Sequence, residues 1–192
     1  MHNQQKWDMS ASNEKPDIIN NKIKLINANY VPDSFVTSLN ETYEWIWLPH
    51  SDANQLIPIR NAKHVLLNMR NTLPITMKDH LNFLERYNSF QRIDFVLVDK
   101  DSRQYVGGMN ISQTNHGFEI GKYIGNTAYL GKRIAYQMSF SFIAFVKKNL
   151  KEITKLHAVT KIDNFKNINL NFKLGFRIIR CVEEDYWLME LK

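Results

Sequence analysis

The sequence predicts an α/β domain, in the broad sense that includes α+β folds, with a mixed, mostly antiparallel sheet and helices on both faces. Three β-forming segments, residues 93–100, 105–114 and 118–125, follow one another with short polar turns between them, which is the pattern of an antiparallel meander. Residues 134–149 then place apolar side chains at every fourth position, which indicates an amphipathic helix. A strand–helix–strand order follows and requires a crossover, so the sheet is expected to be mixed.

The N-terminal part is expected to add shorter elements to this core. Residues 1–21 are polar and are predicted to form a flexible tail, which leaves residues 22–192 as a single domain. We expect a short strand over residues 22–29 and a helix over residues 33–40. Residues 43–49 are rich in β-branched and aromatic side chains and are predicted to form a strand.

Two helices are predicted between that strand and the meander. Residues 52–61 form the first, and Pro58 is expected to kink it or end it early, because proline lacks the N–H that a helix interior uses. The second spans residues 76–87, where Thr76 followed by Asp79 approximates a capping box.

The chain after the amphipathic helix is expected to complete the sheet. Residues 153–162 alternate in the manner of a strand, and residues 167–174 form a short helix that Gly175 closes as a left-handed cap. Two more strands are predicted over residues 176–179 and 186–191.

Composition limits the class of protein. The chain has 192 residues, a formal net charge of +6 and 44% hydrophobic residues, as expected of one folded domain. Its longest apolar stretch, residues 138–146, is far shorter than the roughly 20 residues that span a bilayer, and the N-terminus lacks the apolar core of a signal peptide. Cys181 is alone, which excludes an intramolecular disulfide and the usual multi-cysteine zinc sites. We therefore expect a cytoplasmic protein with no metal and no membrane partner.

The positive charge has two interpretations. It favours ligands that carry phosphate, such as CoA, nucleotide-sugars or nucleic acid. It is equally typical of a lysine-rich solvated surface. The sequence contains no recognised nucleic-acid-binding motif, so we expect no nucleic-acid partner.

One segment, residues 119–135, has the features of an anion-binding site. A strand ends at Gly125, a loop with glycine and basic residues follows, and the amphipathic helix begins near Ile134. The amides and the positive dipole end of a helix N-terminus attract a pyrophosphate, and Lys132 and Arg133 add charge. By itself the segment is also compatible with an ordinary strand–loop–helix connection.

A second segment, residues 163–176, gives the first a more specific interpretation. It follows the next strand and contains Asn164, a short helix that begins at Asn167, and a terminal Leu-Gly-Phe. In this order and spacing the two segments resemble the GNAT acyltransferases. The resemblance implies a GNAT-type sheet in which two neighbouring strands splay apart. One is the strand within the first segment, and the other is the strand that precedes the second segment. The cosubstrate acetyl-CoA would lie between these two strands.

The same resemblance implies which residues contact the cosubstrate. The pyrophosphate would meet the N-terminus of the amphipathic helix, and the asparagine side chains would face the pantetheine arm. The residues expected to bind acetyl-CoA are Ile120, Gly121, Lys122, Tyr123, Leu130, Gly131, Lys132, Arg133, Ile134, Ala135, Asn164, Asn167 and Asn171.

The region before the meander carries a narrower resemblance. An Arg60–Asn61 pair, a methionine-bearing apolar stretch, an Ile-Thr step, and His80 with Phe83 soon after it are similar to GNAT enzymes that acetylate amino-sugars on nucleotide carriers, as in pseudaminic acid biosynthesis. Ribosomal-protein N-terminal acetyltransferases resemble this region less. The resemblance implies that Arg60, Asn61 and His80 bind the acceptor. The alternative is a helix-surface arginine and a histidine in the first turn of a helix.

Acetyl transfer to an amine needs a base, a polarised thioester carbonyl and a proton for the CoA thiolate. By resemblance, a backbone amide within residues 121–123 polarises the carbonyl. Glu119 is the expected base, and His116 is a second candidate. The alternatives are a surface carboxylate paired with a lysine and a solvated turn histidine.

Two departures from the GNAT pattern bear on this chemistry. Many relatives carry a tyrosine four residues before the glycine of the second segment, where it acts as general acid for the CoA thiolate. This chain has Asn171 at that position, and an amide has no proton to donate at a useful pKa. Either Tyr123, Tyr129 or water would then supply the proton, or catalysis would be impaired. In the phosphate loop, Leu130 replaces the usual Gln or Arg, and Arg133 replaces the central glycine.

The sequence therefore predicts an acetyl-CoA-dependent N-acetyltransferase that acts on a primary amine. The first expectation for the acceptor is a small molecule, an amino-sugar on a nucleotide carrier. The alternatives are a protein N-terminus, a free amino acid or a polyamine, and a non-catalytic acyl-CoA-binding module. A homodimer is expected from the resemblance alone.

Overall fold

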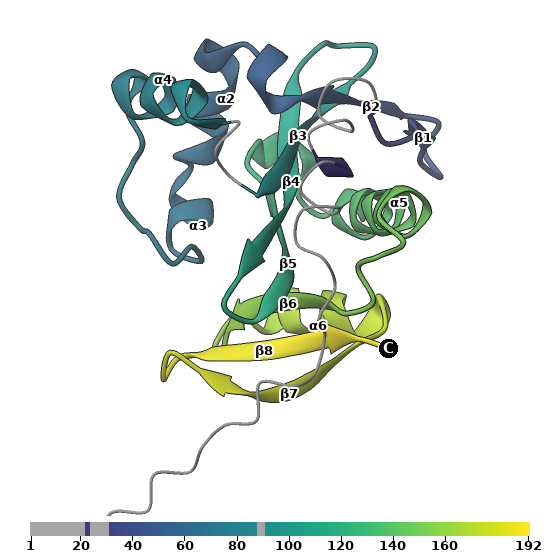
Figure 1. Ribbon diagram of the computed structural model, residues 1–192. Coiled ribbons are helices and arrows are strands. Elements are labelled where there is room, and N and C mark those ends of the chain that lie inside the picture. Colours follow the sequence, from purple (N-terminus) through teal and green to yellow (C-terminus); the bar gives the residue numbers. More distant parts are fainter. Residues whose placement is uncertain (1–21, 24–30, 88–90) are drawn as a thin grey trace, which may run out of the picture.

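The sheet has eight strands in the part of the chain that the structure describes. The computed structural model describes residues 22–23, 31–87 and 91–192 (Figure 1). The strands are β1 (Phe35–Val36), β2 (Thr42–Trp47), β3 (Arg92–Asp99), β4 (Tyr105–Thr114), β5 (Gly117–Ile124), β6 (Leu156–Lys161), β7 (Phe176–Val182) and β8 (Tyr186–Leu191). Their order is β1-β2-β3-β4-β5-β6-β8-β7, and each neighbouring pair is antiparallel except the parallel pair β5–β6.

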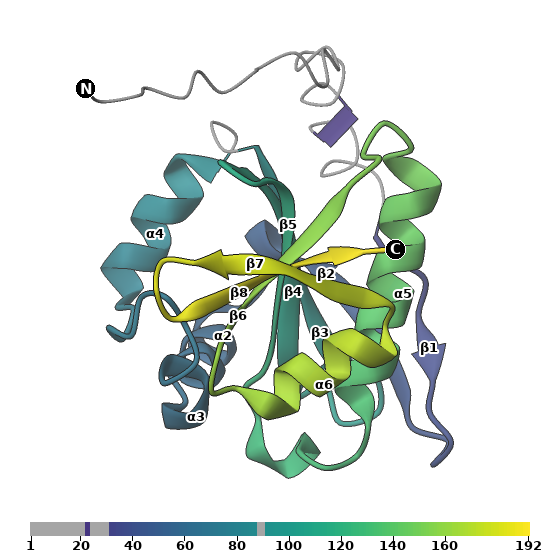
Figure 2. The ribbon, with the colours of Figure 1, turned by 90° about the horizontal axis from the view of Figure 1, so that it is seen from below.

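Helices cover both faces of this sheet. They are α2 (Ala53–Arg60), α3 (Lys63–Leu66), α4 (Met77–Glu85), α5 (Ile134–Asn149) and α6 (Phe165–Lys173), with 3₁₀ turns at Leu48–His50 and Thr127–Tyr129. Helices α2, α3 and α4 lie on one side of the central strands and α5 lies on the other (Figure 1, Figure 2). The predicted fold class, a mixed and mostly antiparallel sheet between helices, is confirmed. None of the helices described could cross a membrane, because none combines the necessary length with the necessary apolar content.

The central elements form where the sequence predicts them. Strands β3, β4 and β5 make the antiparallel meander, and α5 spans the predicted residues. Its four-residue stripe of Ile134, Met138, Phe142 and Val146 is buried against the sheet, which explains why the period alone located the helix. Gly175 has φ +98° and closes α6 as the predicted left-handed cap.

The helix caps also follow the sequence, and Pro58 is accommodated inside a helix. Thr76 and Asp79 form the predicted capping box, with the Thr76 N–H donating to Asp79 Oδ2 at 2.8 Å. Asp52 caps α2 by accepting from the Asn54 N–H at 2.9 Å. Pro58 does not end α2, which continues for two residues beyond it. The apolar face of α2 packs on β3 and β4, and this packing offsets the hydrogen bond that proline cannot make.

The helix predicted over residues 33–40 is wrong. The chain forms the short edge strand β1 and a turn in which Asn40 has φ +58°. Phe35 pairs with Tyr43 of β2, and their rings stack at a centroid distance of 5.4 Å. Strand pairing and ring stacking with β2, which follows β1 after a short turn, outweigh the weak local preference for a helix.

Two other N-terminal expectations have different outcomes. Residues 22–23, the described part of the strand expected over residues 22–29, are helical. Residues 24–29 and the tail predicted over residues 1–21 lie outside the described residues. Helix α3 was not predicted, because four residues are too few to show a helical period.

Candidate active site

The parallel pair β5–β6 is the place where the sheet opens. The pairing of β5 with β6 is short and consists of Phe118 with Leu156 and Glu119 with His157. Strand β5 stays paired with β4 as far as its last residue. A cavity of about 450 Å³ lies along this opening, lined by β5, β6, α6 and the segment 64–70. We call it the splay cavity. The strand splay that the GNAT resemblance implies is therefore present.

The edge of β5 that faces the opening presents backbone amides. The Gly125 N–H donates to the Val106 carbonyl of β4 at 2.9 Å. Because successive residues of a strand direct their N–H groups to opposite edges, Lys122 and Ile124 direct theirs away from β4 and toward the opening. The Ile124 carbonyl shares this orientation, since it lies 2.9 Å from Nε2 of His64 in the cavity wall. An acyl carbonyl in the opening could accept a hydrogen bond from the Lys122 amide.

The predicted acetyl-CoA residues fall into two groups. Those that line the splay cavity are Ile120, Gly121, Lys122, Tyr123, Leu130, Ala135, Asn164 and Asn167. Those outside its lining are Gly131, Lys132, Arg133, Ile134 and Asn171. The Lys132 ammonium donates to Glu41 Oε1 at 2.8 Å and lies 5.1 Å over the Tyr129 ring, so this charge is engaged away from the cavity.

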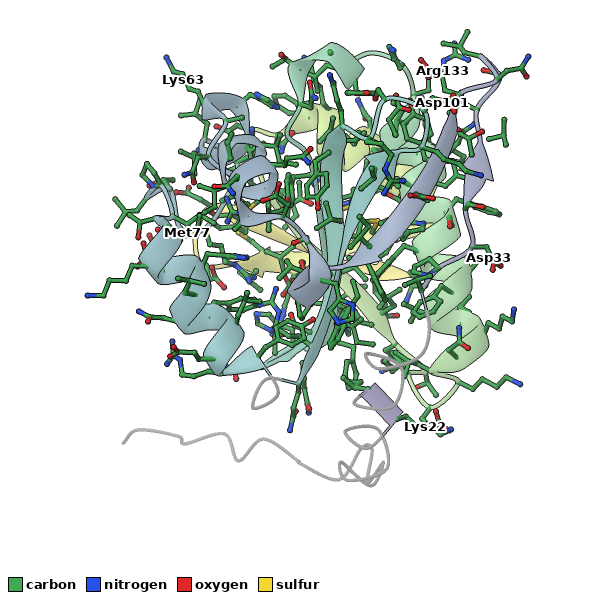
Figure 3. All side chains as sticks on the ribbon, turned by 90° about the horizontal axis from the view of Figure 1, so that it is seen from above. Lys22, Asp33, Lys63, Met77, Asp101 and Arg133 are labelled. Carbon is green, nitrogen blue, oxygen red and sulfur yellow. The ribbon has the colours of Figure 1, made fainter. Side chains whose placement is uncertain are left out.

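The loop before α5 has an unusual backbone. Gly131 and Arg133 have φ +82° and +61°, and Arg133 is the left-handed N-cap of α5. Its side chain lies exposed at the surface (Figure 3). A non-glycine residue in this conformation costs roughly 1–2 kcal/mol, because its Cβ crowds the backbone. This strain explains why glycine is usual at this position of the GNAT pattern.

The strain at Arg133 predicts a difference between two substitutions. We expect Arg133→Gly to be roughly 0.5–1 kcal/mol more stable than Arg133→Ala, because only glycine relieves the left-handed strain, and its greater freedom in the unfolded chain cancels part of the gain. Urea unfolding of both variants measures the difference, and each lacks the same guanidinium. Equal stability, or a less stable Arg133→Gly, would show that φ at this position carries no strain.

Lys122 and Asn171 meet across the opening. The Lys122 Nζ donates to Asn171 Oδ1 at 2.5 Å, and the Asn171 amide donates to Thr160 Oγ1 of β6 at 3.0 Å. Asn171 is 0% exposed. Burial lowers the pKa of Lys122 from 10.5 to about 8, because a buried ammonium loses its hydration. The tyrosine position of the GNAT pattern is thus held by an amide that orients a lysine.

Glu119 is paired with an arginine rather than with a lysine. Its carboxylate accepts from the Arg70 guanidinium at 3.3 and 3.4 Å, and its side chain is 12% exposed in the wall of the splay cavity. Burial raises the pKa of Glu119 above its usual value, although the charges of Arg70 and His116 oppose the shift. His116 lies in the β4–β5 turn and lines neither cavity described here. Of the two predicted bases, the structure brings Glu119 to the opening.

A second cavity of about 310 Å³ lies on the other side of β5, among α2, α4 and strands β3 to β5. We call it the acceptor-side cavity. It shares Met69, Gly121, Lys122 and Tyr123 with the splay cavity. The two cavities therefore meet at the middle of β5, beside the amide of Lys122.

The residues predicted to bind the acceptor divide between this cavity and the framework. Arg60 and His80 line the cavity, and each has one buried nitrogen, Nη1 and Nε2, without a hydrogen-bond partner in the described residues. The Arg60 guanidinium lies 5.9 Å over the Tyr123 ring. Burial lowers the pKa of His80, which favours its neutral form. The Asn61 amide instead bonds the backbone of Ile75 at 2.7 and 2.9 Å, so it holds the segment that leads to α4.

Several lining residues were not found by sequence reasoning. Those with polar or charged groups in the splay cavity are His64, Asn68, Arg70, Thr160, Lys161, Lys166 and Tyr186. Lys161 and Lys166 lie on either side of Asn164, and their spacing was a usable signal. The others come from α3, the segment after it, β6 and the start of β8, which only the fold brings to the opening.

Comparisons with known proteins agree with this geometry. An uncharacterized protein of Methanocaldococcus jannaschii is 30% identical over 124 residues, which are 62% of this chain and 24% of that protein, so the chain spans about a quarter of its length. The N-acetyltransferase PseH of Campylobacter jejuni has a TM-score of 0.58 at 18% identity, over 78% of this chain and 97% of that one. The spermidine N-acetyltransferase of Vibrio cholerae, solved with CoA and spermine, has a TM-score of 0.63 at 15% identity, over 78% and 94%.

These structural likenesses establish the fold, and a family model establishes the family. The model of the acetyltransferase (GNAT) domain matches residues 47–177, more than half of the chain. The match includes α2 to α6 and the splayed pair β5–β6. The chain belongs to the GNAT family of acetyltransferases, whose acetyl donor is acetyl-CoA.

Proposed function

We propose that this protein transfers the acetyl group of acetyl-CoA to the primary amine of a small molecule, with an amino-sugar on a nucleotide carrier as the first candidate acceptor. One observation carries the proposal. The splay cavity and the acceptor-side cavity meet at residues 121–123 of β5. A transfer between two bound substrates needs two such compartments with one shared wall, so that the reacting atoms are held together.

The splay cavity suits acetyl-CoA. The strand-edge amide of Ile124 can pair with an amide of the pantetheine arm, as a partner strand would. Lys161 and Lys166 place positive charge in the same wall for the phosphates. Asn164 caps α6 by accepting from the Asn167 N–H at 3.2 Å, and both line the cavity. Acetyl-CoA supplies the activated acyl group, and these residues bind and orient it.

Three groups of the chain are assigned to the reaction at the shared wall. The Lys122 amide donates to the thioester carbonyl and stabilises the oxyanion as the amine attacks. Glu119 takes the proton of the amine, directly or through water, and its raised pKa brings it closer to the pH at which a base is most effective. Arg70 holds the Glu119 carboxylate in place through its paired hydrogen bonds.

The charge in the acceptor-side cavity supports a phosphate-bearing acceptor over a polyamine. Its carboxylates are already engaged, since Asp79 caps α4 and Asp94 accepts from Arg92 at 2.5 and 2.7 Å. The buried Nη1 of Arg60 has no partner in the described residues. An anionic or strongly polar group of the acceptor would satisfy it, whereas a polycation would meet an uncompensated positive charge.

A panel of amines tests the proposal. Acetyl-CoA is supplied with UDP- and dTDP-linked amino-sugars, peptides, free amino acids and polyamines, and the release of CoA thiol is followed. We expect turnover, fastest on a nucleotide-linked amino-sugar. Faster turnover on spermidine or on peptides would transfer the acceptor assignment to those amines. A rise of the melting temperature with acetyl-CoA, without turnover on any amine, would instead support a non-catalytic acyl-CoA-binding module.

Arg60 gives a prediction that is specific to the acceptor. We expect Arg60→Met to raise the KM for a nucleotide-linked amino-sugar roughly tenfold to hundredfold, because a hydrogen bond to a charged group contributes about 1.5–3 kcal/mol. The Kd of acetyl-CoA should stay unchanged, since Arg60 lies outside the splay cavity. Arg180→Met, which removes an exposed arginine of β7, is the matched control. If Arg60→Met leaves this KM within twofold, Arg60 does not contact the acceptor.

A further inference from the structure

The departing CoA thiolate needs a proton, and the usual tyrosine is absent from its position in this chain. Asn171 takes that place, and its amide N–H already donates to Thr160 Oγ1 at 3.0 Å. A neutral carboxamide does not release a proton at a useful pKa. The donor is therefore water or another group in the wall of the splay cavity.

Tyr123 and Tyr129, the two tyrosines that the sequence offers as donors, are poorly suited. The Tyr129 hydroxyl donates to Asp99 Oδ2 at 2.8 Å, lies 3.2 Å from Ser102 Oγ, and lines neither cavity. Tyr123 lines both cavities, but burial raises its pKa above its usual value, so it holds its proton more tightly. Its ring also lies under the Arg60 guanidinium, on the acceptor side.

Lys122 combines the required place and the required proton. It lines both cavities at their shared wall, and its Nζ lies 2.5 Å from Asn171 Oδ1. The ammonium is therefore held next to the position from which a tyrosine hydroxyl would act. We propose that Lys122, oriented by Asn171, donates the proton to the CoA thiolate. This inference rests on the acetyl transfer proposed above.

The proton balance of the step is complete. The amine nitrogen bonds to the thioester carbon, and the protons it sheds pass to Glu119 and to water. The C–S bond then breaks with its electron pair on sulfur. The Lys122 ammonium gives one proton to that sulfur and becomes a neutral amine, which water reprotonates before the next turnover. Glu119 then passes its proton to water, so the products are the N-acetylated amine, the CoA thiol and one released proton.

The environment of Lys122 matches this task. Burial lowers its pKa to about 8, which is near the value of about 8.5 for an alkyl thiol such as cysteine, so the proton transfer to sulfur is close to balanced. The charged or titratable groups of the splay cavity are Glu119, His64, Arg70, Lys161, Lys166 and Tyr186. Those of the acceptor-side cavity are Arg60, Asp79, His80, Arg92 and Asp94, and Tyr123 lines both. The shift of Lys122 comes from desolvation rather than from one of these charges.

Two substitutions separate proton donation from positive charge. Lys122→Met removes both, and Lys122→Arg keeps the charge on a group that does not give up its proton. The reaction is run with acetyl-CoA and the fastest amine of the panel described above. We expect both variants to lose about 100-fold or more in kcat, the range typical of a lost general acid, with the Kd of acetyl-CoA within threefold of wild type. Lys148→Met, at an exposed lysine of α5, is the matched control and should keep its rate.

The pH profile supplies a second readout. Wild-type kcat should fall above pH 8 as Lys122 loses its proton, and this alkaline limb should disappear in Lys122→Met. In the wild-type protein, NMR of ¹³Cε-labelled lysine, with the Lys122 signal identified by its loss in Lys122→Arg, should show a titration midpoint near 8. A midpoint near 10.4, the ordinary value of lysine, would overturn the proposal.

The outcomes distinguish this proposal from the proposed function. If the wild type turns over and Lys122→Met keeps its kcat, Lys122 is not the donor and acetyl transfer still stands. If Lys122→Arg alone keeps its kcat, the residue supplies charge and not a proton, and the assignment is wrong. If the wild type binds acetyl-CoA but acetylates no amine, the proposed function fails, and the donor role of Lys122 fails with it.

Discussion

Replacing Glu119 with glutamine is expected to lower kcat of acetyl transfer by about 100-fold or more near pH 7, because a positioned general base contributes roughly 10²–10⁴ to the rate. Glutamine keeps the shape of the side chain and can still contact Arg70, but it cannot accept a proton. The Kd of acetyl-CoA should change little, since the cosubstrate is held by other parts of the splay cavity wall.

The loss of rate in Glu119→Gln is expected to depend on pH in a definite direction. Burial raises the pKa of Glu119, so the base of the wild type becomes active as the pH rises through that raised value. In Glu119→Gln that limb is absent, and the remaining rate follows the deprotonation of the free amine. The deficit should therefore be largest at low pH and should shrink as the pH approaches the pKa of the acceptor amine.

A matched control removes the other carboxylate that binds the same arginine. Glu183 lies 3.2 Å from Arg70 Nε, is 48% exposed and lines neither cavity, so Glu183→Gln should keep its rate within about twofold. Loss of folding is not expected to explain the effect of Glu119→Gln. When folding raises the pKa of a carboxyl group, the ionised group destabilises the folded state. Removing the charge of Glu119 therefore takes away no stabilisation at neutral pH. An unchanged rate and pH profile would remove Glu119 as the base.

Truncating Phe142 to alanine is expected to lower the free energy of unfolding by about 3–5 kcal/mol, because it leaves a cavity where α5 meets the sheet. Phe142 is 0% exposed. Its ring lies 6.1 Å from Trp45 of β2 and 6.3 Å from Phe95 of β3. Edge and tilted ring contacts of this kind add to the apolar area that the side chain buries. Urea unfolding of wild type and variant measures the loss.

Phe140 provides the control on the same helix. It is 62% exposed and faces away from the sheet, so Phe140→Ala should change stability by less than about 0.5 kcal/mol. The two substitutions remove the same atoms from positions two residues apart on α5. A loss of less than about 1 kcal/mol for Phe142→Ala would contradict the packing of α5 on β2 and β3.

The fold was predictable from the sequence where local patterns coincide with burial. The stripe through Met138 and Phe142 has the period of a helix because one face of α5 is buried, and the meander β3–β5 is a series of β-forming segments with short turns between them. The error over residues 33–40 has the opposite cause. Phe35 is placed by pairing and stacking with Tyr43, and no local pattern encodes a partner strand.

The candidate site was predictable in outline and not in its contacts. Motif order located Glu119, Lys122 and Asn164 in one opening. It could not show that Lys122 meets Asn171, because the two are 49 residues apart in the sequence and only the fold brings them together. Nor could it show that the Asn61 amide is hydrogen-bonded to the backbone of Ile75. The sequence does not distinguish a polar side chain that binds a ligand from one that bonds the backbone.

The most direct test of the central claim follows both products of one reaction. Purified protein, acetyl-CoA and a UDP-linked amino-sugar are incubated, and the CoA thiol and the N-acetylated sugar are quantified together by mass spectrometry. We expect the two to appear in equal amounts, at a rate that depends on the protein. Acetyl-CoA that is hydrolysed without acetylated product, or bound and recovered intact with every amine of the panel, would contradict it.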